Sequence, residues 1–186
     1  FIITVGSTVA IGTPSNNTVS TDKLQNLAVT TAKIADNAIT AAKLADNAIA
    51  SDAQKNTVAG TNAGDSFTGT DAEENTLLGY QAGTAITTGD YNTAVGSLAL
   101  KSATTSIKNT AIGYGSLADV TTGDQNTSIG ANALNANTTG ESNTALGAQA
   151  LASNTTGTQN VAVGRYALDA NTTGNYNVAL GTSVLT

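Results

Sequence analysis

Two acidic residues at a fixed spacing are the first candidates for chemistry. Asp124 and Glu141 are 17 residues apart, and Asp90 lies 34 residues before Asp124. If the chain returns to the same place every 17 residues, neighbouring carboxylates lie about one strand spacing of ~5 Å apart, as in a retaining glycosidase or a weak cation site. The corresponding positions in the other intervals are not acidic: they hold Ile107, Thr158 and Asn175. We therefore expect solvated charges at chain corners in preference to a catalytic pair.

The residue types argue against most enzyme classes. The chain contains no Cys and no His, which excludes thiolate metal sites and removes the usual general base. The stretch Gly113–Ala118, GYGSLA, matches the nucleotide-binding pattern G-x-G-x-x-[GA], but no strand-helix-strand context surrounds it. We predict no enzyme activity, no catalytic residue, no metal site and no cofactor.

The net charge argues against two classes of binding partner. The net charge is −6, with only seven Lys and Arg residues spread along the chain, which argues against nucleic acid and anionic membranes. The apolar opening FIITVGSTVAIG lacks a basic leader and is too short to span a bilayer. We expect neither nucleic-acid binding nor membrane insertion.

Tyrosines and asparagines supply the remaining candidate surface sites. Tyr80, Tyr114 and Tyr166 could stack on sugars, or could fill gaps at a seam between chains. Tyr91 and Tyr176 each precede an asparagine of the 17-residue repeat. Four N-x-[ST] sequences within the 17-residue repeat are possible glycosylation sites, although such matches arise by chance in a chain rich in Asn and Thr. They begin at Asn126, Asn137, Asn154 and Asn171.

A strict repeat must position these residues. Its consensus is N-[TV]-[ALS]-[LIV]-G-x-x-small-L, a variable stretch, and then T-T-G in most copies, without insertion from residue 75 to residue 186. The repeat asparagines are Asn75, Asn92, Asn109, Asn126, Asn143, Asn160 and Asn177, and the glycines four residues later are Gly79, Gly96, Gly113, Gly130, Gly147, Gly164 and Gly181. Equal lengths and equivalent residues are typical of a solenoid in which each coil stacks on the last.

The repeat also predicts local structure. Thr93 and Val95 should face one side of a strand and Ala94 the other. We expect each coil to enclose mainly Thr, Val, Ile and Leu, with Leu100 and its equivalents as a second inward point. Glycines and the TTG stretches should form corners, and the asparagines should stack into a hydrogen-bonded ladder. The fold class is therefore an all-β fibrous repeat protein, a parallel β-roll or β-solenoid with 17-residue coils.

A second repeat precedes the first. Residues 18–55 carry a ten-residue unit in which Val19, Val29, Ile39 and Ile49 recur. A threonine could cap a helical turn in each unit and Asn37 could end it, so we expect short helical turns and extended pieces in a trimeric stalk. Residues 1–17 are predicted to be an N-terminal strand. Residues 56–74 fit neither period and are predicted to be a junction anchored by Phe67.

Both repeats resemble known families. The segments NTAVG, NTAIG and NVALG, and STVAIG at residues 7–12, resemble the N-S-V-A-I-G head repeat of trimeric autotransporter adhesins of the YadA type, although NTAVG is one residue shorter. The resemblance implies a left-handed parallel β-roll assembled as a trimer. The unit VTTAKIADNAI resembles a repeat common in bacteriophage tail fibres. Together the two resemblances cover residues 7–12 and 19–186.

These observations predict an elongated homotrimer with a structural role. We expect a shaft that spaces a receptor-binding tip beyond its ends, in a phage tail fibre that mediates host attachment from the virion. Its partners would be itself, other fibre or baseplate proteins, and host glycans or a receptor. The alternative is a bacterial surface adhesin head or an extracellular filament subunit that binds glycans or surfaces. Because the last coil stops unfinished at Thr186, we expect a longer rod.

Overall fold

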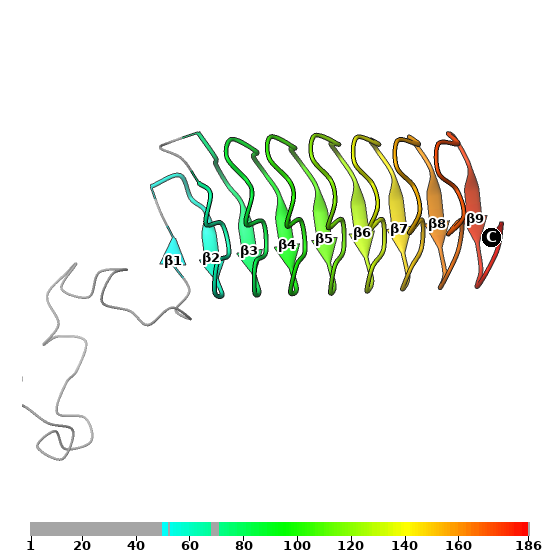
Figure 1. Ribbon diagram of the computed structural model, residues 1–186, viewed down its shortest axis with the longest axis horizontal. Coiled ribbons are helices and arrows are strands. Elements are labelled where there is room, and N and C mark those ends of the chain that lie inside the picture. The colour runs from blue at the N-terminus through cyan, green and yellow to red at the C-terminus, as the bar shows by residue number, and fades with distance from the viewer. Residues whose placement is uncertain (1–49, 52, 68–70, 186) are drawn as a thin grey trace, which may run out of the picture. The chain divides into compact units, whose positions relative to one another are not determined.

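The computed structural model describes residues 50–51, 53–67 and 71–185. The predicted N-terminal strand and most of the predicted stalk lie outside these residues. Nine short strands form one sheet in sequential order (Figure 1). Their bounds are β1 Ala50–Ser51, β2 Thr57–Ala59, β3 Thr76–Leu78, β4 Thr93–Val95, β5 Thr110–Ile112, β6 Thr127–Ile129, β7 Thr144–Leu146, β8 Val161–Val163 and β9 Val178–Leu180.

Strands β2 to β9 are parallel, and each belongs to a different coil of a solenoid. From β3 onward every residue pairs with the residue 17 positions later, as in Thr93 with Thr110 and Val95 with Ile112. The described part of the chain contains no helix. A parallel β-solenoid with 17-residue coils, predicted from the spacing of Asn and Gly, is confirmed.

The interior of the coil differs from the predicted one. Ala94 has an exposed fraction of 0%, whereas Thr93 and Val95 lie half-buried on the outer side of the strand. Leu100 is also fully buried. The expectation that each coil encloses mainly Thr, Val, Ile and Leu is therefore wrong for the strands, whose Thr, Val and Ile lie outside, whereas the leucines, Ile86 and Val120 are enclosed. The reason is steric: two layers of backbone lie so close that a leucine from one side leaves room for only a small residue beneath the strand.

One coil shows this volume limit directly. In the coil that begins at Asn75, the strand carries Leu77 in place of alanine, and Gly83 replaces the leucine found in later coils. A Cβ atom added at Gly83 would lie 2.7 Å from a methyl group of Leu77. In this coil the strand supplies the large side chain, whereas in later coils the opposite side of the coil supplies it. The interior volume that side chains fill is therefore about the same in both cases, as close packing requires.

The stack begins earlier than the sequence suggested. The predicted junction, residues 56–74, contains β2, which pairs in parallel with β3. Asn56 accepts a hydrogen bond from the backbone N–H of Asn75, 19 residues later. This first coil is therefore two residues longer than the others and does not fit the strict 17-residue period. Phe67 is partly buried and packs against the core, as expected of an anchor.

Candidate functional site

The solenoid aligns equivalent residues into columns, and the asparagine column is the most uniform. The backbone N–H and the side-chain Nδ2 of Asn92 both donate to Oδ1 of Asn75, at 2.9 and 3.1 Å. Nδ2 of Asn92 also donates to the carbonyl oxygen of Ser106 at 2.8 Å. The predicted ladder is confirmed, and its buried amides are satisfied along the stack. These asparagines hold the coils together and offer no group to a ligand.

The corner glycines are required by close backbone approach. Gly130 has a φ of 143°, which residues with a side chain rarely adopt. A Cβ atom at this position would lie 2.5 Å from the backbone of Gly147 in the next coil. Gly113 belongs to the same column, with a φ of 129°. The nucleotide-like stretch that Gly113 begins is therefore explained by coil stacking.

Of the three candidate acidic residues, Asp90 and Asp124 accept backbone hydrogen bonds, whereas Glu141 is exposed. Oδ1 of Asp124 accepts the N–H of Ile107 at 2.8 Å, and Oδ1 of Asp90 accepts the N–H of Glu73 at 2.9 Å. Asn175 makes the equivalent contact with Thr158 at 2.7 Å. Because an uncharged amide performs the same task, the shared role needs an oxygen acceptor and no charge. Across residues 50–51, 53–67 and 71–185, no cluster of three or more acidic side chains is arranged to hold a metal ion.

The asparagines of the NTT sequences form a second ladder. Nδ2 of Asn154 donates to Oδ1 of Asn137 at 3.0 Å, and Nδ2 of Asn171 donates to Oδ1 of Asn154 at 2.9 Å. Asn126, Asn137 and Asn154 are fully buried, and Asn171 is partly buried. A glycan on the first three would have to displace a neighbouring coil. Their 17-residue register was the available signal for a ladder, and sequence reasoning missed it.

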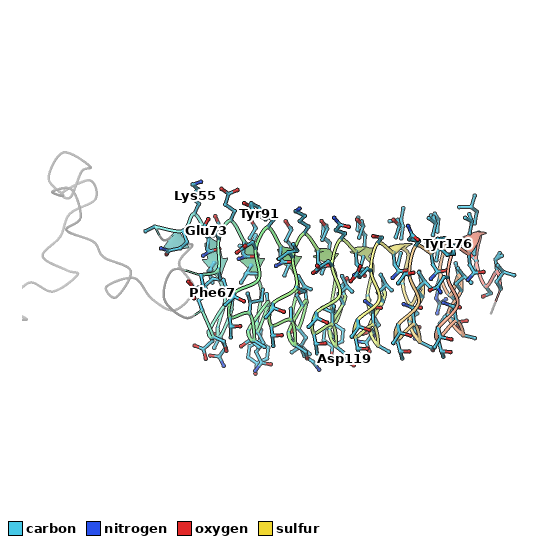
Figure 2. The ribbon with its side chains drawn as sticks, turned by 90° about the horizontal axis from the view of Figure 1, so that it is seen from above. Lys55, Phe67, Glu73, Tyr91, Asp119 and Tyr176 are labelled. Carbon is cyan, nitrogen blue, oxygen red and sulfur yellow. The ribbon has the colours of Figure 1, made fainter. Side chains whose placement is uncertain are left out.

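The tyrosines divide into exposed and covered residues. Tyr80 and Tyr114 are 52% and 57% exposed. Tyr166 is half-buried, with the Arg165 guanidinium 4.6 Å from its ring centre and donating to its hydroxyl at 3.1 Å. Tyr91 and Tyr176 lie along one edge of the stack, opposite Asp119 (Figure 2). Tyr80 and Tyr114 therefore remain candidates for sugar contact.

The outer side of the strands is a surface that sequence reasoning placed in the interior. We call it the sheet face, the first and third residues of β3 to β9. Its third-residue row is wholly aliphatic, and exposed fractions reach 38% at Ile112, 45% at Leu146 and 68% at Leu180. No residue of the face is charged; its members are Thr76, Leu78, Thr93, Val95, Thr110, Ile112, Thr127, Ile129, Thr144, Leu146, Val161, Val163, Val178 and Leu180. A continuous uncharged aliphatic strip of this kind is typical of an interaction surface.

Comparison with known protein families, with curated proteins and with solved structures found no match. Within the described part of the chain, no helix is long and apolar enough to cross a membrane.

Proposed function

We propose that this chain is the structural shaft of a homotrimeric fibre in which the sheet faces of three copies pack together. The observation that carries the proposal is the aliphatic row on the sheet face, half-buried or exposed in every coil from β3 to β9. Burial of apolar area contributes about 25 cal/mol per Å², so contacts repeated in every coil add up along the stack. A single chain leaves this area in water.

The repeated surface favours spacing over recognition. Receptor pockets need a local set of distinct groups, whereas successive coils present nearly the same residues. We therefore propose a shaft that carries a receptor-binding tip beyond its ends. The resemblance of the ten-residue repeat to phage tail fibres favours a virion tail fibre joined to other fibre or baseplate proteins. A bacterial surface adhesin head or extracellular filament is the alternative.

The oligomeric state tests the proposal. Light scattering should give three times the 18.4 kDa chain mass. The double variant Ile112→Asp/Leu146→Asp should dissociate, because six carboxylates would meet at a desolvated contact. Thr122→Asp/Thr139→Asp is the matched control, since both threonines are exposed at corners away from the sheet face. A monomeric wild-type protein, or equal effects of the two variants, would contradict the proposal.

A second candidate function is glycan contact along the shaft. It is favoured by the exposure of Tyr80 and Tyr114, which belong to one column two coils apart. Aromatic rings stack on sugars, and many weak contacts along a fibre would gain from avidity. The test is binding to surface polysaccharide by wild type and by Tyr80→Ala/Tyr114→Ala. Binding by both at equal strength would exclude these rings, and Tyr91→Ala controls for loss of an exposed tyrosine.

A further inference from the structure

The two-residue strand β1 differs in direction from every other strand. It pairs with β2 in antiparallel register, Ala50 with Val58 and Ser51 with Thr57. The remaining pairs in the sheet are parallel. The chain therefore reverses between Ser51 and Thr57 and folds back over the side of β2 that faces away from the stack (Figure 1).

The backbone groups that β1 covers can be assigned from the contacts of β2 on its other side. Thr57 donates its N–H to the carbonyl of Asn75 at 2.7 Å, and the carbonyl of Ala59 accepts the N–H of Gly79 at 2.8 Å. Because successive residues of a strand point their backbone groups to opposite sides, the N–H and C=O of Val58 point away from β3. Ala50 is the register partner of Val58.

The geometry points to β1 as a cap that closes this edge of the sheet to a second copy of the chain. An uncovered strand edge is a template for pairing with another chain, and very short edge strands are one way proteins limit such pairing. The competing partner is β2 of a second copy. Two uncovered β2 edges could pair antiparallel about a two-fold axis, with the same backbone geometry that β1 uses within one chain.

The contacts beside the reversal hold the cap close to the first coil. The N–H of Glu74 donates to the carbonyl of Gln54 at 3.0 Å. Nζ of Lys55 lies 2.7 Å from Oε1 of Glu74. This hydrogen bond and the charge of Glu74 raise the pKa of Lys55. Residues 54–56 are thereby stacked on the coil that follows, and the chain before them passes over the edge of β2.

The test uses two proline variants of the full chain. Ala50→Pro removes the N–H that faces Val58, whereas in an antiparallel pair the N–H of the adjacent Ser51 points away, so Ser51→Pro is the matched control. The lost N–H donates to the carbonyl of Val58, so the pair keeps only the bond from the Val58 amide and should open more often. At low protein concentration, Ala50→Pro should therefore speed hydrogen exchange at the Val58 amide by about fivefold to tenfold, the effect of weakening the pair by one backbone hydrogen bond. At high concentration its particle mass should double relative to wild type, with protection of Val58 restored. Ser51→Pro should match wild type in both measurements.

Because the doubling is counted from the wild-type mass, the test does not depend on how many copies the shaft contains. Faster exchange at Val58 without any gain in mass would overturn the cap, since the edge would then be open and still not pair. Unchanged exchange would show that β1 does not cover the edge. Larger particles that have lost the β-sheet circular dichroism signal would also count against the inference, because unfolded chains would then explain the association.

Discussion

The coils before and after Asn126 fill one interior column with different chemistry. We call it the turn column: it holds Ile86, Ala103 and Val120 in the earlier coils and Asn137, Asn154 and Asn171 in the later ones. The same 17-residue coil accommodates both sets. The earlier residues are satisfied by apolar contact, whereas the later ones form a ladder and donate to the carbonyls of Gly140, Gly157 and Gly174.

This difference between the two regions shows that the asparagine column, and not the ladder of the turn column, is needed in every coil. Asn126 and Asn143 of the asparagine column also donate to the carbonyls of Gly140 and Gly157, at 2.9 and 2.8 Å. In the earlier coils, Asn75 and Asn109 make the same bond to Gly89 and Gly123 at 2.9 Å without help from the turn column. The asparagine column therefore satisfies the backbone in both regions. The second ladder mainly satisfies its own amides, and Asn171 also accepts the N–H of Gly174 at 3.1 Å.

The largest expected effect comes from adding a side chain beside the second ladder. A Cβ atom at Gly140 would collide with Oδ1 of Asn137 and with the carbonyl oxygen of Gly157, whereas one at Gly89 would meet only the backbone of Ser106 so closely. Ser106 already occupies this glycine position in one earlier coil. We expect Gly140→Ser to lower the free energy of unfolding by at least about 3 kcal/mol and Gly89→Ser by about half as much. Urea denaturation measures both, and equal losses would refute the distinction.

The next effect tests whether the second ladder is dispensable as a unit. Asn154→Val alone removes two side-chain partners and leaves the amides of Asn137 and Asn171 short of one bond each, so it should cost about 2–3 kcal/mol. Replacing Asn137, Asn154 and Asn171 together by valine should cost less than that single change, because no ladder amide is left unpaired and the N–H of Gly174, which loses Asn171, is only half-buried. Thermal melts of the single and triple variants give the answer. A triple loss near three times the single loss would show that the ladder itself stabilises the later coils.

A smaller effect is expected where the two regions meet. The hydroxyl of Ser116 donates to the hydroxyl of Ser128 at 2.7 Å, and Ser128 donates to the carbonyl of Ala133 at 2.8 Å. Both serines stand where other coils carry mainly alanine. Ser116→Ala or Ser128→Ala should each cost about 1 kcal/mol, and the double variant should cost about the same as one single. Additive losses in this double-mutant cycle would indicate that the two hydroxyls act independently.

The smallest effect is a gain in stability in the earlier region. The Ser106 hydroxyl is the only buried side-chain polar atom in the described residues that lacks a hydrogen-bond partner. Ser106→Gly restores the residue found at this position in the other complete 17-residue coils and removes the unpaired group. We expect the free energy of unfolding to rise by about 1 kcal/mol. No gain, or a loss, in urea denaturation would show that the hydroxyl has a partner in solution.

The sequence was sufficient for features that depend on a fixed spacing. The 17-residue coil, the asparagine ladder and the corner glycines were all predictable, because each requires the same residue type at the same place in successive coils. The direction of the strand faces was not predictable in this way. Ala94 and Val95 are both apolar, and alternation says only that they point to opposite sides. Which side is inside depends on the thickness of the coil, which Leu100 sets from the opposite wall.

Two other features were hidden for different reasons. The first coil is longer than the period and its strand reverses the order of the two apolar residues, so Asn56 fell outside the repeat although Asn56 and Gly60 keep the Asn-to-Gly spacing of the other coils. Asn137 and its equivalents match the N-x-[ST] glycosylation motif, and this match drew attention away from their role in a hydrogen-bonded ladder. The proposed surface site was missed together with the strand direction, because a residue assigned to the core is not considered as a partner contact.

The central claim is that the chain is a stack of interchangeable coils, and a register deletion tests it most directly. Removing residues 143–159 deletes one complete 17-residue coil and joins Ser142 to Asn160, which keeps both ladders continuous. Removing residues 143–158 leaves one surplus residue and interrupts the register. Thermal unfolding followed by circular dichroism should remain cooperative after the first deletion, with a slightly lower midpoint, and should show a broad or much earlier loss of β-structure after the second. Equal tolerance of the two deletions would contradict the account.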